Sequence, residues 1–236
     1  MTQNHNMRTA VITGTSRGLG RALTEKLLSS GWYVYGISRS SSRINHPNFQ
    51  EYLVDITDEP AVQRVINSIK EAGKSIEVLV NNAGSASMNA VLLTPFKTAE
   101  SIMRLNYLGS FNTTQLFGKI MARQRHGLII NITTVAVPLN LEGEAAYVAS
   151  KAAVEALTRV TAREIVAQGV KIIALGFGPM DTDLTRAISR DKIQKINDQI
   201  GRPHGTTLSE ATDFILEKIN NPEIISGSVE YLGDIR

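Results

Sequence analysis

The stretch TAVITGTSRGLG, residues 9–20, decides how the rest of the chain is interpreted. Its first five residues are apolar or β-branched, as in a strand that is buried on both faces of a parallel sheet. Gly14, Gly18 and Gly20 follow, where a helical pattern begins. Glycines let the backbone turn tightly and let a phosphate approach, and a helix N-terminus offers N–H groups and the positive end of a dipole. The stretch therefore predicts a nucleotide-binding turn between a strand and a helix, against the plainer interpretation of an ordinary glycine-rich turn.

Strand-like and helix-like patterns alternate along the whole chain. Short apolar runs predict further strands at Trp32–Ile37, Gln50–Val54, Glu77–Asn81, Gly127–Thr133, Val170–Leu175 and Ser228–Leu232. Helical patterns between them predict helices at Leu19–Ser30, Glu59–Ala72, about Pro95–Arg123 and about Ala145–Ala167. This alternation is typical of right-handed βαβ units. It predicts an α/β protein, with one doubly wound Rossmann domain over residues 1–236 and a mostly parallel, seven-stranded sheet that carries helices on both faces.

The segment at about 183–205 is the one irregular stretch. Apolar residues recur there at helical spacing, at Leu184, Ile188, Ile193, Ile196 and Ile200. This spacing predicts a small amphipathic element between the last two strands, which we interpret as a lid over the substrate. The surplus of Lys and Arg in this lid segment fits either attraction of an anionic substrate or the solvated face of a helix.

Composition excludes several classes of protein. The 236 residues are 42% hydrophobic and 20% charged, with a net charge of +3, which is typical of a soluble globular protein and gives no support to nucleic-acid binding. Cysteine is absent and the four histidines lack metal-ligand spacing, so no metal site is predicted. No apolar run approaches the ~18 residues that span a bilayer, and the polar start, MTQNHNMR, is unlike a signal peptide. We therefore expect a cytoplasmic protein that binds no membrane.

Tyr147 and Lys151 form the second candidate motif, at the start of a predicted helix. Residues four apart share one helical face, and an ammonium beside a phenol favours the phenolate and lowers the pKa of the tyrosine. Such a tyrosine can exchange a proton with a substrate oxygen near neutral pH. Taken alone the pair is a weak signal, because Tyr and Lys are often four apart on a solvated helix.

Further motifs give this pair a context. The segments NNAG (81–84), LNYLGSF (105–111), INITT (130–134), YVASKAAV (147–154) and GPMDT (178–182) follow the glycine turn in this order. With the turn itself, they make the chain strongly resemble the short-chain dehydrogenase/reductase family, from about Arg8 to Gly233. The resemblance implies a Rossmann-type oxidoreductase that interconverts a carbonyl and a secondary alcohol by hydride transfer.

The same resemblance assigns the catalytic residues. It implies that Tyr147 is the general acid/base and that Lys151 lowers its pKa and holds ribose hydroxyls. Asn106 resembles the helix asparagine that holds a water in the proton relay. Thr134 takes the place of the family's usual serine, so that Thr134 and Tyr147 would hold the reacting oxygen; Thr133 is the poorer candidate because it faces the other way on the strand. A second departure is Phe177, where the family often has proline.

The cofactor is predicted to be NADP(H). An NAD enzyme places an acid after the second strand to bind ribose hydroxyls, whereas this chain has neutral Ser38 followed by Arg39. A guanidinium can bind a phosphate through two hydrogen bonds, and Arg17 is placed to assist, with Arg43 a weaker candidate. The predicted cofactor-binding set is Gly14, Ser16, Arg17, Gly18, Leu19, Gly20, Ser38, Arg39, Asp55, Ile56, Asn82, Ala83, Gly84, Tyr147, Lys151, Gly178 and Thr182.

Two other functions compete with the oxidoreductase. A catalytically silent NADP-binding sensor or scaffold would keep the fold without turnover, but Tyr147, Lys151 and Asn106 are all present. A sugar-nucleotide epimerase or dehydratase would carry a longer substrate region. The expected substrate is a small carbonyl or alcohol, in outline resembling those of β-ketoacyl reductases and of many other reductases. A homodimer or homotetramer is expected from the resemblance and from apolar residues on more than one side of the two long helices, including Leu116, Phe117, Ile120, Ala153, Leu157 and Val160.

Overall fold

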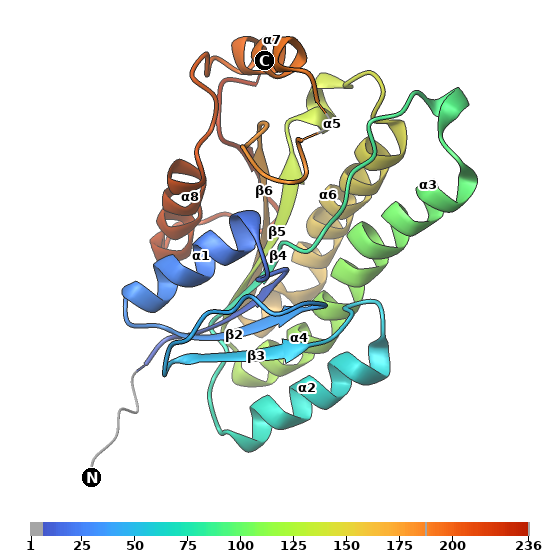
Figure 1. Cartoon of the computed structure of the whole chain (residues 1–236). Helices are drawn as coiled ribbons and strands as arrows, with labels where there is room; N and C mark the ends of the chain where they lie inside the picture. The colour runs from blue at the N-terminus through green and yellow to red at the C-terminus, as the bar shows by residue number, and fades with distance from the viewer. Residues whose placement is uncertain (1–6, 187, 236) are drawn as a thin grey trace.

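A computed structural model describes residues 7–186 and 188–235. Seven strands form one sheet in the order β3-β2-β1-β4-β5-β6-β7 (Figure 1), and all neighbouring strands run parallel. The strands are β1 Thr9–Thr13, β2 Tyr33–Ser38, β3 Phe49–Leu53, β4 Val78–Asn81, β5 Gly127–Thr134, β6 Val170–Phe177 and β7 Val229–Tyr231. The order reverses at β1 and β4, which is where ligands bind in open α/β sheets. The predicted doubly wound Rossmann fold is confirmed.

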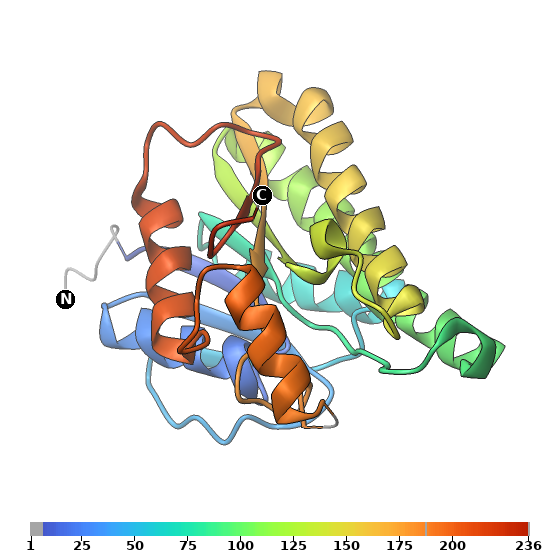
Figure 2. The same cartoon turned by 90° about the horizontal axis from the view of Figure 1, so that it is seen from above.

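Helices cover both faces of the sheet, as predicted. Alternate residues of each strand point to opposite faces: Ala10 and Ile12 pack with α1 (Gly18–Ser29) and α8 (Leu208–Asn220), whereas Val11 packs on the other side. That second side carries α2 (Glu59–Glu71), α4 (Ser110–Gln124) and α6 (Ala145–Ile165). Figures 1 and 2 show α1 and α8 together on one side of the sheet. The long apolar strands are therefore explained by burial from two sides.

The long helix predicted at Pro95–Arg123 is interrupted. A short 3₁₀ turn, η1 (Val91–Leu93), precedes α3 (Phe96–Met103), and a π-helical turn, η2 (Arg104–Gly109), joins α3 to α4. π turns inside α-helices are frequent at functional sites. Asn106 lies in this turn and is fully buried.

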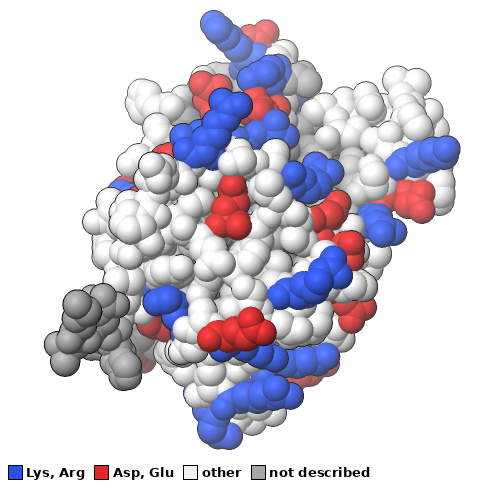
Figure 3. All heavy atoms as spheres, turned by 60° about the horizontal axis from the view of Figure 1, so that its bottom comes forward, with Lys and Arg blue, Asp and Glu red and all other residues white. Residues whose placement is uncertain are grey.

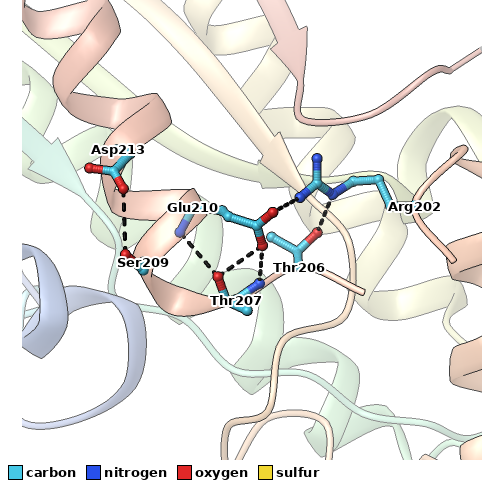
Figure 4. Close-up of polar contacts among 6 residues, drawn as sticks. All are labelled: Arg202, Thr206, Thr207, Ser209, Glu210 and Asp213. Atoms are coloured by element: carbon cyan, nitrogen blue, oxygen red, sulfur yellow. Dashed lines mark hydrogen bonds and ion pairs between the residues drawn. The ribbon is translucent and has the colours of Figure 1, made fainter. Parts of the chain in front are cut away.

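Four elements were not predicted: η1, α5 (Ala136–Leu139), η3 (Val166–Gln168) and α8; the amphipathic element that was predicted corresponds to α7 (Arg190–Gln199). The helix α7 falls inside the predicted lid segment and lies at the top in Figure 1, beyond the carboxyl ends of the strands. The helix α8 begins with a capping box, in which the Thr207 side chain accepts from the Glu210 N–H and the Glu210 carboxylate accepts from the Thr207 N–H. Figure 4 shows this box with Arg202, which pairs with the same carboxylate.

Charged side chains show no field of one sign on the face drawn in Figure 3, where Lys and Arg are interspersed with Asp and Glu. Over the ranges 7–186 and 188–235, no helix has both the length and the apolar character that crossing a membrane requires. In the same part of the chain, no three His, Asp or Glu side chains gather in a group that could hold a metal ion.

Candidate active site

A cavity of about 500 Å³ opens at the carboxyl edge of the sheet, and we call it the main cavity. All predicted site residues except Gly20 and Asn106 line it. The predicted residues that line it are Gly14, Ser16, Arg17, Gly18, Leu19, Ser38, Arg39, Asp55, Ile56, Asn82, Ala83, Gly84, Thr134, Tyr147, Lys151, Gly178 and Thr182. The fold thus brings residues that are up to 168 positions apart, Gly14 and Thr182, to one surface.

The glycine turn forms one end of the main cavity. Gly14 has φ +77°, and a Cβ there would lie 2.9 Å from the Ala83 Cα. A Cβ on Gly20 would lie 2.3 Å from the Gly14 carbonyl oxygen. Both positions therefore require glycine, because the turn packs directly against the segment after β4. The helix α1 begins at Gly18, and the Arg17 side chain before it does not cap the first N–H groups of that helix.

Ser38 and Arg39 line the same end of the cavity, beyond β2. The buried Ser38 hydroxyl donates to the Ser40 carbonyl at 2.7 Å, and Arg39 is exposed. Arg17 forms an ion pair with Asp183 at 3.0 Å, so that the first residue of the lid segment contacts the glycine turn. Arg43, the weaker phosphate candidate, is exposed in the left-handed region at φ +57°.

The segment after β4 forms the floor of the cavity. The Thr13 hydroxyl accepts hydrogen bonds from the N–H groups of Asn82 and Ala83, each at 3.0 Å, and the Asn82 amide donates to the Thr13 carbonyl at 3.0 Å. A Cβ on Gly84 would lie 3.1 Å from the Asn106 Oδ1 and 3.5 Å from the Lys151 Nζ. The backbone of Gly84 therefore passes close to both side chains, and a larger residue there would crowd the Asn106 Oδ1.

Tyr147 and Lys151 lie at the other end, on successive turns of α6, and both are buried. The Lys151 Nζ donates to the Ile132 carbonyl at 2.7 Å. Thr134, at the end of β5, lines the cavity with them; its hydroxyl donates to the Phe177 carbonyl at 3.5 Å and accepts from the Ala136 N–H at 3.2 Å. The Thr133 hydroxyl instead donates to Glu155 at 2.8 Å, as the alternation of side chains along a strand requires.

The pKa values at this end differ from the sequence expectation. Burial raises the pKa of Tyr147 to about 12; the Thr134 hydroxyl lowers it and the Glu144 carboxylate raises it. Burial lowers the pKa of Lys151 to about 8. The sequence analysis expected Lys151 to lower the Tyr147 pKa, but Lys151 is not one of the groups that shift this pKa in the structure. The reason is that desolvation opposes both charged forms, while the Lys151 ammonium is bound to a backbone carbonyl.

The Asn106 side chain links two segments of the site through hydrogen bonds. Its Nδ2 donates to the Ser85 carbonyl at 2.8 Å and to the Ser150 hydroxyl at 2.9 Å, and its Oδ1 accepts from the Ser85 N–H at 2.8 Å. Both amide hydrogens are thus used by protein atoms. The side chain joins the segment after β4 to α6, which holds Tyr147 and Lys151, and it has no hydrogen left to donate to a water.

Phe177 continues β6 rather than opening a loop. Its side chain is buried and packs edge-on against Phe214 of α8, with ring centroids 6.1 Å apart. Its carbonyl accepts from the Val135 N–H at 3.1 Å. The aromatic ring at this position therefore helps to hold α8 against the end of the sheet, next to Gly178 in the cavity wall.

Sequence reasoning placed the Val135–Glu144 segment at the pocket but gave no role to Glu144, which is buried and lines the main cavity three residues before Tyr147. Lys192 of α7 approaches it, with the Nζ 3.4 Å from a Glu144 oxygen. The other basic residues of α7, Arg190 and Lys195, are exposed, which fits the solvated face of a helix. Apolar side chains complete this end of the cavity, among them Met88, Leu141, Met180, Ile188 and Ile196.

Comparison with known proteins gives the family. The family model described as short chain dehydrogenase matches residues 8–193. The chain is 29% identical over 195 residues to the 3-oxoacyl-(acyl-carrier-protein) reductase FabG of Escherichia coli (strain K12), covering 80% of each chain. It is 30% identical over 203 residues to FabG of Staphylococcus epidermidis, covering 82% of this chain and 83% of that protein. The chain therefore belongs to the short-chain dehydrogenase/reductase family.

Solved structures agree with this assignment. ElxO with NADP bound superposes with a TM-score of 0.86 at 26% identity, covering 95% of this chain and 96% of that one. A 4-hydroxyisoleucine dehydrogenase mutant complexed with NADH and succinate superposes with a TM-score of 0.87 at 20% identity, covering 96% and 97%. The fold of an oxidoreductase is thus shared over nearly the whole chain.

Proposed function

We propose that this protein is an NADP(H)-dependent reductase that interconverts a carbonyl and a secondary alcohol. The observation that carries the proposal is that one cavity joins the glycine turn to Tyr147, Lys151 and Thr134. Relatives named as 3-oxoacyl reductases and a structural neighbour that binds NADP support the same reaction class. A screen that follows NADPH absorbance with β-ketoacyl thioesters, diketones and keto-sugars tests it. Absence of turnover with all of them would favour a silent sensor or scaffold.

The residues present fit NADP(H). The glycine turn has no room for side chains at Gly14 and Gly20, so that the backbone can approach a pyrophosphate closely. Neutral Ser38 and exposed Arg39 line the cavity where the adenosine ribose would be bound, and neither side chain would repel a 2′-phosphate. Arg17 would have to share its guanidinium between that phosphate and Asp183.

The catalytic chemistry follows from the buried end of the cavity. Bound NADPH would supply the hydride. Tyr147 stays protonated at neutral pH, because burial raises its pKa, and it donates this proton to the carbonyl oxygen. The Thr134 hydroxyl, which lines the cavity with Tyr147, would hold the same oxygen. Lys151, with a pKa of about 8, is suited to return a proton to Tyr147 near neutral pH.

Reduction should slow above about pH 8. The Lys151 ammonium loses its proton at a lower pH than an ordinary lysine, since burial lowers its pKa to about 8. A pH profile of kcat/KM for ketone reduction should therefore fall on its alkaline side near that value. In Lys151→Arg the guanidinium stays charged. We expect this variant to be less active than the wild type and its pH profile of kcat/KM to lack the alkaline fall. An identical fall in both proteins would rule out Lys151 as its source.

We propose that the protein forms a homo-oligomer, but the candidate interface residues differ from those expected from the sequence. Leu116 and Phe117 belong to the core and cannot form an interface. Ile120, Ala153 and Leu157 are half-buried. The exposed apolar residues of this face are Leu108, Phe111 and Val160, which are 49%, 42% and 56% exposed. We expect light scattering at micromolar concentration to give at least a dimer.

The double variant Phe111→Asp/Val160→Asp should shift the protein toward monomer, because charges replace apolar surface that a partner would bury. The matched control Val166→Asp changes another exposed valine, at the far end of α6 in η3, and should leave the mass unchanged. A monomeric wild type at micromolar concentration would contradict the proposal. A cytoplasmic location stays a prediction of the sequence.

A further inference from the structure

Glu144 is a buried acid that the proposed reaction does not use. It stands at the N-cap of α6 but makes no side-chain capping bond there. The residue is 3% exposed, and it lines the main cavity. Glu144 lies three residues before Tyr147, at the start of the same helix, and its charge raises the pKa of Tyr147.

The carboxylate is only partly compensated by the protein. The Lys192 Nζ lies 3.4 Å from its Oε1. The shorter bond of this ammonium, 2.8 Å, goes to the Glu142 carbonyl. A carboxylate can accept about four hydrogen bonds, and burial without partners is costly for a charged group. Burial raises the pKa of Glu144, and Lys192 lowers it. The group thus retains acceptor capacity in a place where water is largely excluded.

Glu144 is the one carboxylate that α6 and its cap contribute to the lining of the main cavity. The charged residues that line the described part of the cavity are Arg17, Arg39, Asp55, Glu144, Lys151 and Asp183. Of these, only Glu144 and Lys151 belong to α6 and its cap, and Lys151 donates to the Ile132 carbonyl. The walls nearby are apolar, with Leu141, Ile188 and Ile196 among them.

We propose that Glu144 determines specificity by selecting carbonyl substrates that carry an ammonium group a few bonds from the carbonyl. The inference rests on the proposed function and names the substrate class of that same site. An ammonium brings the N–H donors and the positive charge that the carboxylate lacks, and charge-assisted hydrogen bonds are the stronger ones. A substrate carboxylate in the same place meets a like charge in a poorly solvated cavity.

Three ketones of nearly the same shape test the charge preference directly. They are 4-(dimethylamino)butan-2-one, which is cationic at neutral pH, 5-methylhexan-2-one, which is neutral, and 4-oxopentanoate, which is anionic. We expect kcat/KM of the wild type with NADPH to fall in this order, with about a tenfold advantage of the cation over the neutral ketone. Calorimetric titration of the same compounds into the NADP⁺-saturated protein gives the comparison independently of turnover.

Two glutamate variants separate the effect of the Glu144 carboxylate on specificity from the general effect of removing one negative charge. Glu144→Gln should reduce the ratio of cationic to neutral kcat/KM to within about twofold, because the amide keeps the shape and removes the charge. A ratio is measured on one preparation, so that a loss of folded protein cancels. Glu142→Gln makes the same chemical change two residues away on an exposed side chain, and it should keep the wild-type ratio.

The Lys192→Met variant distinguishes substrate selection by Glu144 from a purely structural role in which Glu144 holds α7 in place. If Glu144 only holds α7 through Lys192, both Glu144→Gln and Lys192→Met should lower activity toward the three ketones equally. Under the proposal the cationic preference survives in Lys192→Met, because the substrate becomes the partner of the carboxylate. Equal kcat/KM and equal affinity for the three compounds in the wild type, or an unchanged order in Glu144→Gln, would overturn the proposal. Absence of NADPH oxidation with every carbonyl of the wider screen would contradict the proposed function instead, and calorimetry would still decide the role of Glu144.

Discussion

Replacing Tyr147 by Phe should lower the rate of ketone reduction by about 10²–10⁴-fold, the usual loss when general acid–base catalysis is removed. The change deletes the proton donor and keeps the ring that packs at the start of α6. The raised pKa of Tyr147, about 12, means that the deleted group is a protonated hydroxyl at neutral pH. Steady-state NADPH oxidation measures the loss, and a fluorescence titration with NADPH should show binding close to that of the wild type.

A matched control for this variant is Tyr52→Phe. The Tyr52 hydroxyl forms a hydrogen bond with Ser68 at 3.0 Å, and it lies on β3, outside the main cavity. This variant loses one tyrosine hydroxyl, as Tyr147→Phe does, and it should keep wild-type turnover. Retention of more than about half of the wild-type rate in Tyr147→Phe would show that another group donates the proton.

The strands and the glycine turn could be predicted because their signals are local. A strand buried on both faces needs an uninterrupted apolar run, and β1, β4 and β6 each have one. Gly14 and Gly20 of the turn are required by close contacts with the backbone, and their spacing is visible in the sequence. The position of the site then follows, because the carboxyl ends of parallel strands meet at one edge.

Features that depend on tertiary packing could not be predicted in this way. The π turn at Arg104–Gly109 continues a helical pattern without a break in the sequence. One local signal was not used: the capping box of α8, Thr207 with Glu210, is visible in the sequence, and α8 was not predicted. Glu144 resembles an exposed acid before a helix, but in the structure it is buried and contacts Lys192 of α7.

The pKa of Tyr147 illustrates the same limit in the site itself. Spacing places Lys151 on the face of Tyr147, but spacing carries no information on desolvation. Burial is the largest influence on both groups in the structure, and the carbonyl of Ile132 takes the lysine's hydrogen bond. The reductive direction fits this result, because it uses the protonated form of Tyr147.

Replacing Arg39 by Ala should weaken NADPH binding by about tenfold to a hundredfold and leave NADH binding nearly unchanged. A hydrogen bond to a charged group contributes roughly 1.5–3 kcal/mol, and Arg39 lines the cavity beside neutral Ser38. The two cofactors differ only in the 2′-phosphate, so that the ratio of their dissociation constants isolates this contact. Fluorescence titration of both cofactors gives the ratio for each variant.

Arg43→Ala is the matched control for the phosphate contact, because Arg43 is also exposed on the segment between β2 and β3 and does not line the main cavity. It should keep the wild-type preference for NADPH. Ser38→Asp should shift the preference toward NADH, since a carboxylate accepts hydrogen bonds from the ribose hydroxyls and repels the phosphate. Arg17 is already paired with Asp183, so that Arg39 should account for the larger share of the phosphate contact. Equal or tighter binding of NADH by the wild type would end the assignment of Ser38 and Arg39 to NADPH recognition.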